Sequence, residues 1–300
     1  MPLGIMAAMQ EEIDALLKEL PADSKVVDDG QRTYHAGHLW DTSVVMVFSR
    51  WGKVAAATTA THLISEFGVT EILFTGVAGA ARPGLKVGDV VVGARLWQHD
   101  MDARPLFPRH EIPLLGRSSF ASDDKRRDQL LQAAAAFLRD DLPTAGSEAA
   151  RAAFHIQSPK AVEGDIASGD KFFADRAGLA DLLRRLPTIA AVDMESAAVA
   201  QVCHEYGVPF TVVRTISDAA DESAAHDFPR FLTHVASAYS HGIVKRLFDG
   251  PRAHRRLGRS APLGSQVGVP AEDVDNVEAL DGETAFLPGV VRILAGKDGG

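Results

Sequence analysis

The sequence has little cysteine, no surplus of positive charge and no long hydrophobic run. Its 300 residues include one cysteine, Cys203, so no disulfide can form within the chain, which fits a reducing compartment. Because Cys203 lies in an apolar helical pattern, we interpret it as a core residue. The formal net charge of -9 argues against a general binder of nucleic acid or of anionic membranes.

No stretch reaches about 18 uninterrupted apolar residues, which argues against a membrane span. The start of the chain, Met1 to Met9, lacks the basic segment of a signal peptide, so we expect a cytoplasmic protein. What the chain does have is an ordinary globular balance, with 46% hydrophobic and 24% charged residues. This length and composition suffice for a sizeable core in one large domain or two small ones.

Strands and helices alternate over residues 1–250, which predicts a three-layer α/β/α sandwich around a twisted sheet. An early hairpin with a tight turn at Trp40 to Thr42 makes the predicted sheet mixed rather than purely parallel. The predicted strands are 3–9, 30–41, 43–49, 70–79, 88–97, 161–168, 188–192 and 209–217. The predicted helices are 10–20, 52–67, 123–140, 175–186, 194–206 and 227–249.

The domain prediction is one unit over 1–250 with a partly helical insertion at about 141–160. Beyond it the composition changes, since residues 252–259 carry four arginines and residues 272–283 carry six acids. Helical periodicity is also lost, so we predict that 251–300 is a tail, disordered or loosely docked.

Acids stand where predicted strands meet the segments that follow them. Asp193 and Glu195 separate a short apolar strand from an Ala-rich helix, Asp218 closes the last strand, and Glu12 follows the first. Open α/β sheets bind ligands at the carboxyl ends of their strands, so Glu12, Glu195 and Asp218 are candidates for one crevice.

Each of these acids also has a purely structural interpretation. Glu12 could compensate a helix dipole, Glu195 could be a helix N-terminal acid, and Asp218 could cap a turn. Asp193 is equally suited to capping the helix after it. The cluster His99, Asp100 and Asp102 lacks the ligand spacing of a metal site, so we predict no metal.

Seven short runs, in order over about residues 3–248, carry a family resemblance. They are Gly4-Ile-Met-Ala-Ala-Met9-Gln-Glu-Glu12, Gly52-Lys-Val-Ala-Ala-Ala57, Thr75-Gly-Val-Ala-Gly79, Leu85-Lys-Val-Gly-Asp89, Ser168-Gly-Asp-Lys-Phe172, Val192-Asp-Met-Glu195 and Val213-Arg-Thr-Ile-Ser-Asp218. Together they resemble the 5'-methylthioadenosine/S-adenosylhomocysteine nucleosidases of the purine nucleoside phosphorylase superfamily. The resemblance implies hydrolysis of the N-glycosidic bond of 5'-thio-substituted adenosines in methionine salvage, without a cofactor, by a homodimer.

The resemblance also implies roles for named residues. Asp218 would protonate adenine N7, Glu12 would activate the water, and Glu195 would accept hydrogen bonds from the ribose hydroxyls. The other implied contacts are Met9 and Met194 on the sugar, Phe172 stacked on adenine, the backbone of Phe173 at the edge of adenine, Arg214 beside the water and the carboxylates, and Ser217 orienting Asp218.

Two residues depart from the family pattern. Val77 stands where the family usually has a serine, and Trp51 stands where it usually has a small aliphatic residue that lines the 5' end of the substrate pocket. We therefore expect Trp51 to shorten or cap that pocket. The alternative reaction is phosphorolysis, which the carboxylate of Glu12 disfavours because it would repel phosphate. A binding protein without catalysis is the alternative of another class, and the presence of all three acids argues against it.

Overall fold

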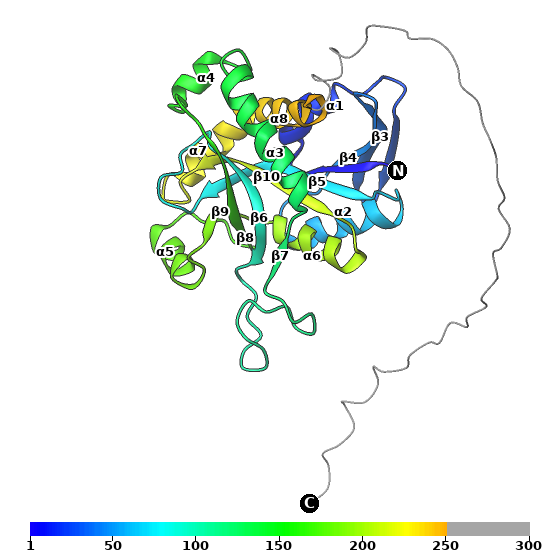
Figure 1. The fold of residues 1–300 in the computed structure, drawn as a ribbon. Coiled ribbons are helices and arrows are strands. Elements are labelled where there is room, and N and C mark those ends of the chain that lie inside the picture. Colours follow the sequence, from blue (N-terminus) through cyan, green and yellow to red (C-terminus); the bar gives the residue numbers. More distant parts are fainter. Residues whose placement is uncertain (251–300) are drawn as a thin grey trace, which may run out of the picture. The chain divides into compact units, whose positions relative to one another are not determined.

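The computed structural model describes residues 1–250, shown as a ribbon in Figure 1. The tail predicted for 251–300 lies outside the described residues. Within 1–250 no helix is both long and apolar enough to cross a membrane. The described part is built on one large mixed sheet, whose central strand order is β10-β6-β8-β9-β5-β1-β4-β3-β2.

The first half of the sheet grows outward from a fully buried strand, β1 (Leu3–Ala7). This strand pairs in parallel with β4 (Thr42–Phe48) and β5 (Glu71–Ala80). The predicted hairpin is confirmed: β3 (Arg32–Leu39) pairs antiparallel with β4, and the turn residues Trp40 and Asp41 both have positive φ. An edge strand that was not predicted, β2 (Lys25–Asp29), is largely exposed and so has little hydrophobic pattern.

In the second half of the sheet, five strands pair with one another in a closed ring. β5 pairs with β10 (Phe210–Asp218) and with β9 (Ile189–Asp193). β6 (Val90–Gln98) then joins β10 to β8 (Ala161–Ser168), and β8 joins β9. The mixed sheet was predicted, but this ring of five strands was not, because pairing partners far apart in sequence leave no local pattern. The short β7 (Ser119–Ala121), which pairs with β6, was also missed.

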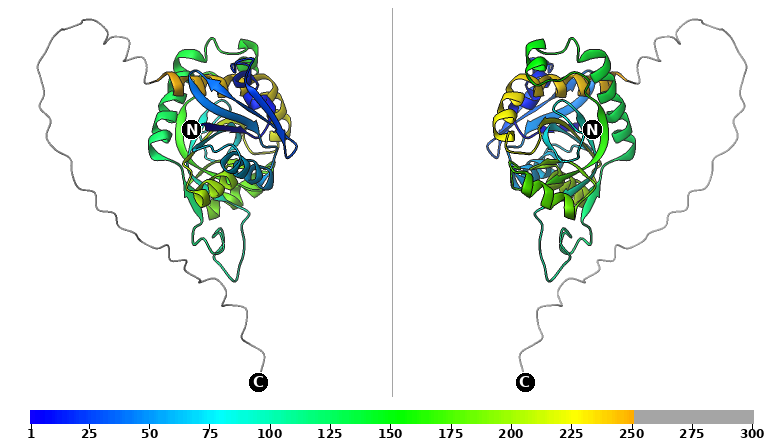
Figure 2. Two further views of the ribbon diagram at one scale, coloured as in Figure 1. Left: turned by 90° about the vertical axis from the view of Figure 1, so that its right-hand side faces the viewer. Right: turned by 90° about the vertical axis from the view of Figure 1, so that its left-hand side faces the viewer.

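Helices cover both faces of the sheet, which confirms the predicted layers (Figures 1 and 2). The helices α1 (Gln10–Leu17), α3 (Asp124–Ala136) and α8 (Ser237–Asp249) pack together over one core, and α2 (Lys53–Ser65) packs with α6 (Ser196–Tyr206) over another. A third, smaller cluster lies under α5 (Arg176–Arg185). The predicted insertion contains α4 (Glu148–Ala153), which buries no residue.

Two helices are less regular in the structure than predicted, because each contains a π-helical segment. The helix predicted at 123–140 is α3 followed by a π-helical segment, η1 (Phe137–Asp141). The helix predicted at 227–249 begins earlier, as α7 (Ala224–Phe231), and passes through η2 (Leu232–Ala236) into α8. A π turn inserts one extra residue without changing the overall apolar content, so the hydrophobic pattern did not reveal it.

Candidate active site

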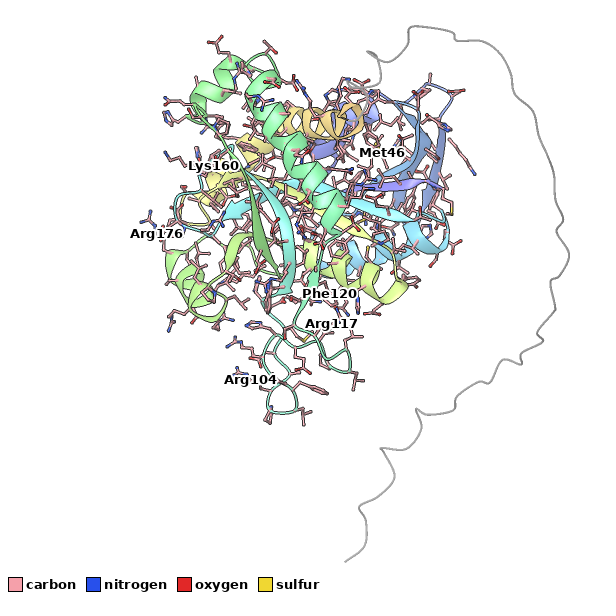
Figure 3. The ribbon with its side chains drawn as sticks, viewed as in Figure 1. Met46, Arg104, Arg117, Phe120, Lys160 and Arg176 are labelled. Atoms are coloured by element: carbon pink, nitrogen blue, oxygen red, sulfur yellow. The ribbon has the colours of Figure 1, made fainter. Side chains whose placement is uncertain are left out.

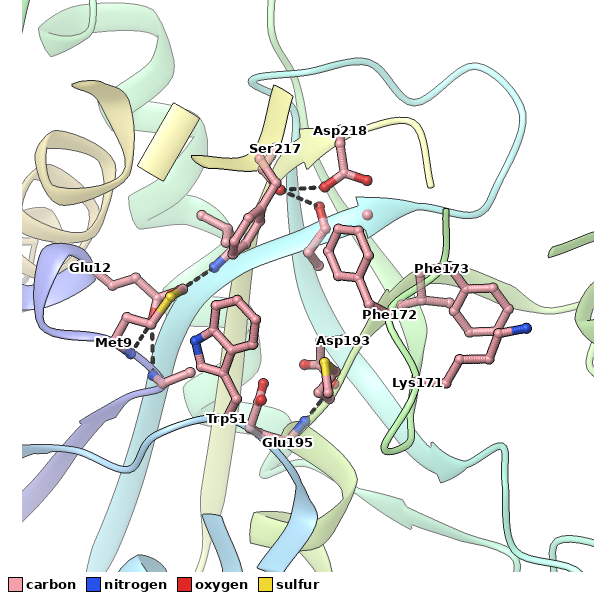
Figure 4. A pocket seen from close by; sticks show the side chains of 17 residues that line it. Met9, Glu12, Trp51, Lys171, Phe172, Phe173, Asp193, Glu195, Ser217 and Asp218 are labelled. Atoms are coloured by element: carbon pink, nitrogen blue, oxygen red, sulfur yellow. Dashed lines mark hydrogen bonds between the residues drawn. The ribbon is translucent and has the colours of Figure 1, made fainter. Parts of the chain in front are cut away.

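A pocket of about 540 Å³, part of which is open to solvent, lies where β1, β5, β9 and β10 end (Figure 4). Its lining combines acidic, aromatic and small apolar side chains. It is lined by Ala8, Met9, Glu12, Trp51, Val77, Ala78, Gly79, Lys171, Phe172, Phe173, Val192, Asp193, Met194, Glu195, Ser217, Asp218 and Phe228. All of the predicted site residues line this pocket except Arg214.

Glu12 lies at the start of α1 and is 1% exposed. Its Oε2 accepts the N–H groups of Ala8 (2.8 Å) and Met9 (2.9 Å), and its Oε1 accepts the N–H of Val77 (2.9 Å). Burial raises the pKa of Glu12, while the nearby Arg214 and the three amides act in the opposite direction. The carboxylate is thus fixed in orientation and made more basic than an exposed glutamate, which suits a group that accepts a proton from water.

Arg214 lies behind the pocket on β10 and is completely buried. Its Nε donates to Asp193 Oδ2 (2.8 Å), its Nη1 to the carbonyl of Thr75 (3.0 Å) and its Nη2 to Ser196 Oγ (2.9 Å). A side chain at Gly76 would clash with both this guanidinium and Glu12, so glycine is required there by close approach. Arg214 therefore acts on the pocket through its charge rather than by lining it.

Asp193 both caps a helix and pairs with a cation. Its Oδ1 accepts the N–H groups of Glu195 and Ser196 (3.2 Å each) at the start of α6. The ion pair with Arg214 involves its other oxygen, and the two side chains are almost entirely buried. The capping prediction is met in part, since the N-cap residue is Glu195 and Asp193 binds the first amides from two residues before it. The sequence contained no sign that Asp193 would be the partner of Arg214.

Glu195 is held at the opposite side of the pocket from the strand that carries Asp218. Its Oε1 accepts the N–H of Gly52 (2.9 Å), at the start of α2. Burial and the neighbouring Asp193 raise the pKa of Glu195 to about 8, against the opposing effects of Arg214 and the Gly52 amide. Its second oxygen faces the pocket without a protein partner among the hydrogen bonds of the described residues. That oxygen is free to bind a ligand hydroxyl.

Asp218 ends β10 and is 3% exposed. Ser217 Oγ donates to its Oδ2 (2.7 Å), and the N–H of Ala220 donates to its Oδ1 (2.8 Å). A register shift between Ile216 and Asp218 lets both consecutive side chains, Ser217 and Asp218, line the pocket. Burial raises the pKa of Asp218, and the acids Asp227 and Asp221 raise it further. A carboxyl group with a raised pKa can keep a proton and donate it.

Phe172 and Phe173 follow β8 and face different ways (Figure 4). Phe172 is 37% exposed and meets the ring of Phe228 edge to face at 5.7 Å. Phe173 is buried in the cluster under α5, between the ring of His99 (5.2 Å) and the ammonium of Lys171 (4.8 Å from the ring centre). The side chain of Phe173 thus anchors the loop, while that of Phe172 is available to a flat ligand.

Trp51 stands at the mouth of the pocket and is 51% exposed. Its ring meets Phe228 of α7 edge to face at 5.6 Å, so Phe228 lies between Trp51 and Phe172. Phe228 was not predicted, because its helix carries no local signal that links it to the pocket. Val77, Met9 and Met194 add apolar surface to the lining.

Metal binding has no support in the part of the chain that is described. Over residues 1–250 no group of three or more His, Cys, Asp or Glu side chains could hold a metal ion. The Lys53 ammonium forms an ion pair with Asp100 Oδ1 (2.7 Å), and the Arg104 guanidinium forms one with Asp102 Oδ2 (2.6 Å). These two acids of the cluster with His99 are therefore engaged in ion pairs.

Comparison with known proteins identifies the family of the chain. A family model described as the phosphorylase superfamily matches residues 2–249. A 5'-methylthioadenosine/S-adenosylhomocysteine nucleosidase of Colwellia psychrerythraea (strain 34H / ATCC BAA-681) is 36% identical over 247 residues, which is 82% of this chain and 96% of that protein.

Two solved structures have the same fold at similar identity. The nucleosidase of the same name from Neisseria meningitidis, in complex with methylthio-immucillin-A, has a TM-score of 0.71 and 32% identity, over 83% of this chain and 99% of that one. A futalosine hydrolase of Helicobacter pylori strain 26695 has a TM-score of 0.69 and 32% identity, over 83% of this chain and 97% of that one.

Proposed function

Since the chain belongs to the 5'-methylthioadenosine/S-adenosylhomocysteine nucleosidase family of the phosphorylase superfamily, and is thus an N-glycosyl hydrolase, we propose that it releases adenine from 5'-thio-substituted adenosines. The observation that carries this proposal is the pair Glu12 and Asp218, two buried acids with different partners in one pocket. Water would be the second substrate, and a thioribose the second product.

Asp218 is the proposed acid. Cleavage of the glycosidic bond leaves negative charge on the departing base and oxocarbenium character on the sugar. Proton transfer from Asp218 to adenine N7 neutralises the base as it leaves. The raised pKa of Asp218 supports this role, because the group must still hold its proton near neutral pH. Ser217 keeps the carboxyl group turned toward the pocket through its 2.7 Å hydrogen bond.

Glu12 is the proposed base and holds the attacking water. Three amide donors fix its carboxylate, and the charge of Arg214 favours the ionised form that accepts a proton. As the water attacks the anomeric carbon, one of its protons passes to Glu12. The N–H of Val77 reaches Glu12 whatever the side chain at this position, so the departure from serine leaves this contact in place.

The sugar and the base would lie between these two acids. Glu195 accepts hydrogen bonds from the ribose hydroxyls with the oxygen that Gly52 does not occupy. Met9 and Met194 contact the sugar, Phe172 stacks on adenine, and the backbone of Phe173 reads the edge of adenine. Stacking on an aromatic ring depends little on the substituents of the base. The backbone contact of Phe173 would therefore supply the selectivity for adenine.

Hydrolysis is favoured over phosphorolysis by charge. The alternative would place phosphate where Glu12 lies, and two anions at contact distance repel each other strongly in a buried site. Of the described residues that line the pocket, Lys171 alone is a cation, and its ammonium lies over Phe173 and 3.7 Å from Asp175. Little in the lining would therefore balance a bound phosphate.

The substrate test is adenine release from methylthioadenosine, followed with and without phosphate. We expect release in phosphate-free buffer at an unchanged rate, and its loss in Asp218→Asn. Release that requires phosphate would make the protein a phosphorylase and remove the role assigned to Glu12. Futalosine belongs in the same assay, because the futalosine hydrolase of Helicobacter pylori and the nucleosidase of Neisseria meningitidis are each 32% identical to this chain.

Trp51 is the proposed determinant of selectivity at the 5' end. Its ring and that of Phe228 narrow the mouth of the pocket with apolar surface. A methylthio group fits such a surface, whereas a homocysteine tail would bring its charged amino and carboxyl groups against it. We expect kcat/KM to be about tenfold higher for methylthioadenosine than for S-adenosylhomocysteine, and Trp51→Ile to reduce this ratio. Equal values for the two substrates in the unchanged protein would refute the role of Trp51.

The family resemblance also supports a homodimer in the cytoplasm, acting in methionine salvage. Pro113 lies on the segment that joins β6 to β7. By the family resemblance, this is the position where the partner subunit of a dimer contributes to the 5' end of the pocket. The same segment exposes Leu106 and Leu114, which favours its burial by a second copy. Light scattering of the purified protein tests the dimer, and a monomeric mass at micromolar concentration would exclude a stable one.

A further inference from the structure

Two neighbouring amides at the start of α2 are held by carboxylates from two distant segments. The N–H of Gly52 donates to Glu195 Oε1 (2.9 Å), and the N–H of Lys53 donates to Asp170 Oδ1 (2.8 Å). Glu195 belongs to the proposed sugar end of the pocket. Asp170 lies two residues before Phe172, at the proposed base end. The start of α2 thus touches both ends of the site.

The side chain of Lys53 closes this connection into a ring. Its ammonium donates to Asp100 Oδ1 (2.7 Å) and to Gln98 Oε1 (3.1 Å), at the end of β6. The other oxygen of Asp100 accepts the N–H of Asp170 (3.0 Å). Lys53, Asp100 and Asp170, which we call the Lys53 triad, therefore join three segments by three mutual contacts.

The local backbone shows that this approach is close. Gly52 has φ of 92°, and a Cβ atom there would lie 3.0 Å from Asp170 Oδ1. Just before it, Arg50 also has a positive φ, of 75°. Residues other than glycine rarely adopt such angles, and where they do, the surrounding contacts hold them. The triad is thus one of the contacts that hold the turn carrying Trp51 and Gly52, together with the hydrogen bond from the Arg50 N–H to the carbonyl of Ala8 (2.9 Å).

Simple stabilisation does not account well for this arrangement. The Lys53–Asp100 pair is only partly buried, with side chains 19% and 31% exposed, and ion pairs near the surface contribute little to folding, about 0 to 1 kcal/mol each. The triad lies outside the pocket lining. Lys53 nevertheless follows Gly52, whose amide binds Glu195, and Asp170 lies two residues before Phe172. Phe173 anchors the base end separately through its buried side chain. What the triad adds is a fixed distance between the two ends.

We propose that Lys53, Asp100 and Asp170 are positioning residues that set the spacing between the sugar-binding carboxylate, Glu195, and the base-stacking ring, Phe172. This inference rests on the proposed function. A nucleoside must meet both ends at once, whereas free adenine needs only one. Loss of the triad therefore weakens the binding of a nucleoside more than that of adenine. The nucleoside joins base and sugar covalently, so both binding groups must stand at the correct distance from each other.

The test compares two ligands and three variants. Asp170→Ala removes the acceptor for the Lys53 amide, whereas Asp170→Asn keeps an oxygen that can accept it. Asp102→Ala is the matched control, because Asp102 pairs with Arg104 and no hydrogen bond or ion pair of the described residues joins it to α2. Figure 3 labels Arg104 on the β6–β7 segment. The probes are adenine and a C-nucleoside analogue of methylthioadenosine, whose carbon–carbon glycosidic bond cannot be hydrolysed.

We expect Asp170→Ala to weaken the C-nucleoside about tenfold and adenine less than twofold, with a matching loss in kcat/KM for methylthioadenosine. Asp170→Asn should recover most of this loss, and Asp102→Ala should bind both probes as the unchanged protein does. Equal weakening of both probes, or unchanged binding of the C-nucleoside, overturns the proposal. Wild-type protein that binds both probes but releases no adenine contradicts the proposed function alone, and one that binds neither contradicts both.

Discussion

Glu12 and Asp218 are both buried carboxyl groups in one pocket, but their neighbours differ. Glu12 accepts three amide hydrogen bonds and lies within the field of Arg214. Asp218 has one amide and one hydroxyl donor, and its charged neighbours are the acids Asp227 and Asp221. A cation thus acts on one carboxyl group, and further anions act on the other.

The difference supports the proposal that one pocket holds a base and an acid at the same pH. Burial raises the pKa of both groups, but only at Glu12 do a cation and several amides favour the ionised form. At Asp218 the neighbouring anions favour the protonated form, which suits the proposed acid. Substitutions at these groups and at their neighbours can break this division, and their expected effects range from a large loss of rate to a small shift in pH dependence.

Removing either acid should have the largest effect. Asp218→Asn and Glu12→Gln keep the size of each side chain but remove the proton donor or acceptor. We expect each to lower kcat/KM for methylthioadenosine by about 10²- to 10⁴-fold. Circular dichroism and thermal melting check that the variants fold. A loss below tenfold in either folded variant would contradict the role of that residue.

Glu195→Gln should change the pH dependence of stability. The pKa of Glu195 in the folded protein is about 8, against an ordinary value of 4.5, so between these values the folded state binds more protons than the unfolded state. Stability from this group is therefore present below about pH 4.5 and is lost as the pH rises through 8.

The glutamine variant lacks this loss and can still accept the Gly52 N–H. We expect it to gain about 1 to 3 kcal/mol in unfolding free energy relative to the unchanged protein between pH 5 and pH 9. Urea unfolding at both pH values measures the gain. A difference between the two proteins that is the same at pH 5 and pH 9 would show that Glu195 is not held with a raised pKa.

Ser217→Ala should move the alkaline limb of the pH–rate profile. The Ser217 hydroxyl favours the ionised form of Asp218, so its removal raises the pKa of Asp218 further. Activity that needs protonated Asp218 should then persist to higher pH, although the rate falls about tenfold as the carboxyl group loses its orientation. The profile of kcat/KM from pH 5 to 10 measures both. A shift of the alkaline limb to lower pH in Ser217→Ala would contradict the role of the Ser217 hydroxyl in favouring ionised Asp218.

Asp227→Asn should give the smallest effect, in the opposite direction. The negative charge of Asp227 raises the pKa of Asp218, so its neutralisation should shift the alkaline limb to lower pH by a few tenths of a unit. Raising the salt concentration should shrink this shift. Asp249→Asn, at the end of α8, serves as the control for a general change in charge. An equal shift in both variants would remove the special role of Asp227.

Much of this molecule could be predicted from the sequence, because its signals are local. The family, the enzyme class and the mixed three-layer fold are confirmed, and the acids Glu12, Glu195 and Asp218 do share one pocket. Apolar runs such as Leu3 to Ala7 predict buried strands, and an acid directly after such a run predicts the edge where ligands bind.

What escaped prediction depends on contacts between distant segments. The ion pair of Asp193 with Arg214 joins β9 to β10, and Phe228 of α7 lines the pocket beside the rings of Trp51 and Phe172. Arg214 was expected beside the water and the carboxylates. It does lie near Glu12 and pairs with Asp193, but it stands behind the pocket lining, held by Thr75, Asp193 and Ser196. No local pattern encodes such partners, because each residue alone reads as an ordinary strand or helix position.

The most direct test of the division between acid and base uses a substrate whose leaving group needs no proton. In p-nitrophenyl 5-methylthio-β-D-ribofuranoside the phenolate leaves as a stable anion, so an acid contributes little to its departure. We predict that Asp218→Asn hydrolyses this substrate within about tenfold of the unchanged protein, while Glu12→Gln remains as impaired as it is with methylthioadenosine. If Asp218→Asn is equally impaired on both substrates, Asp218 is not the acid, and the division of roles between Asp218 and Glu12 is contradicted.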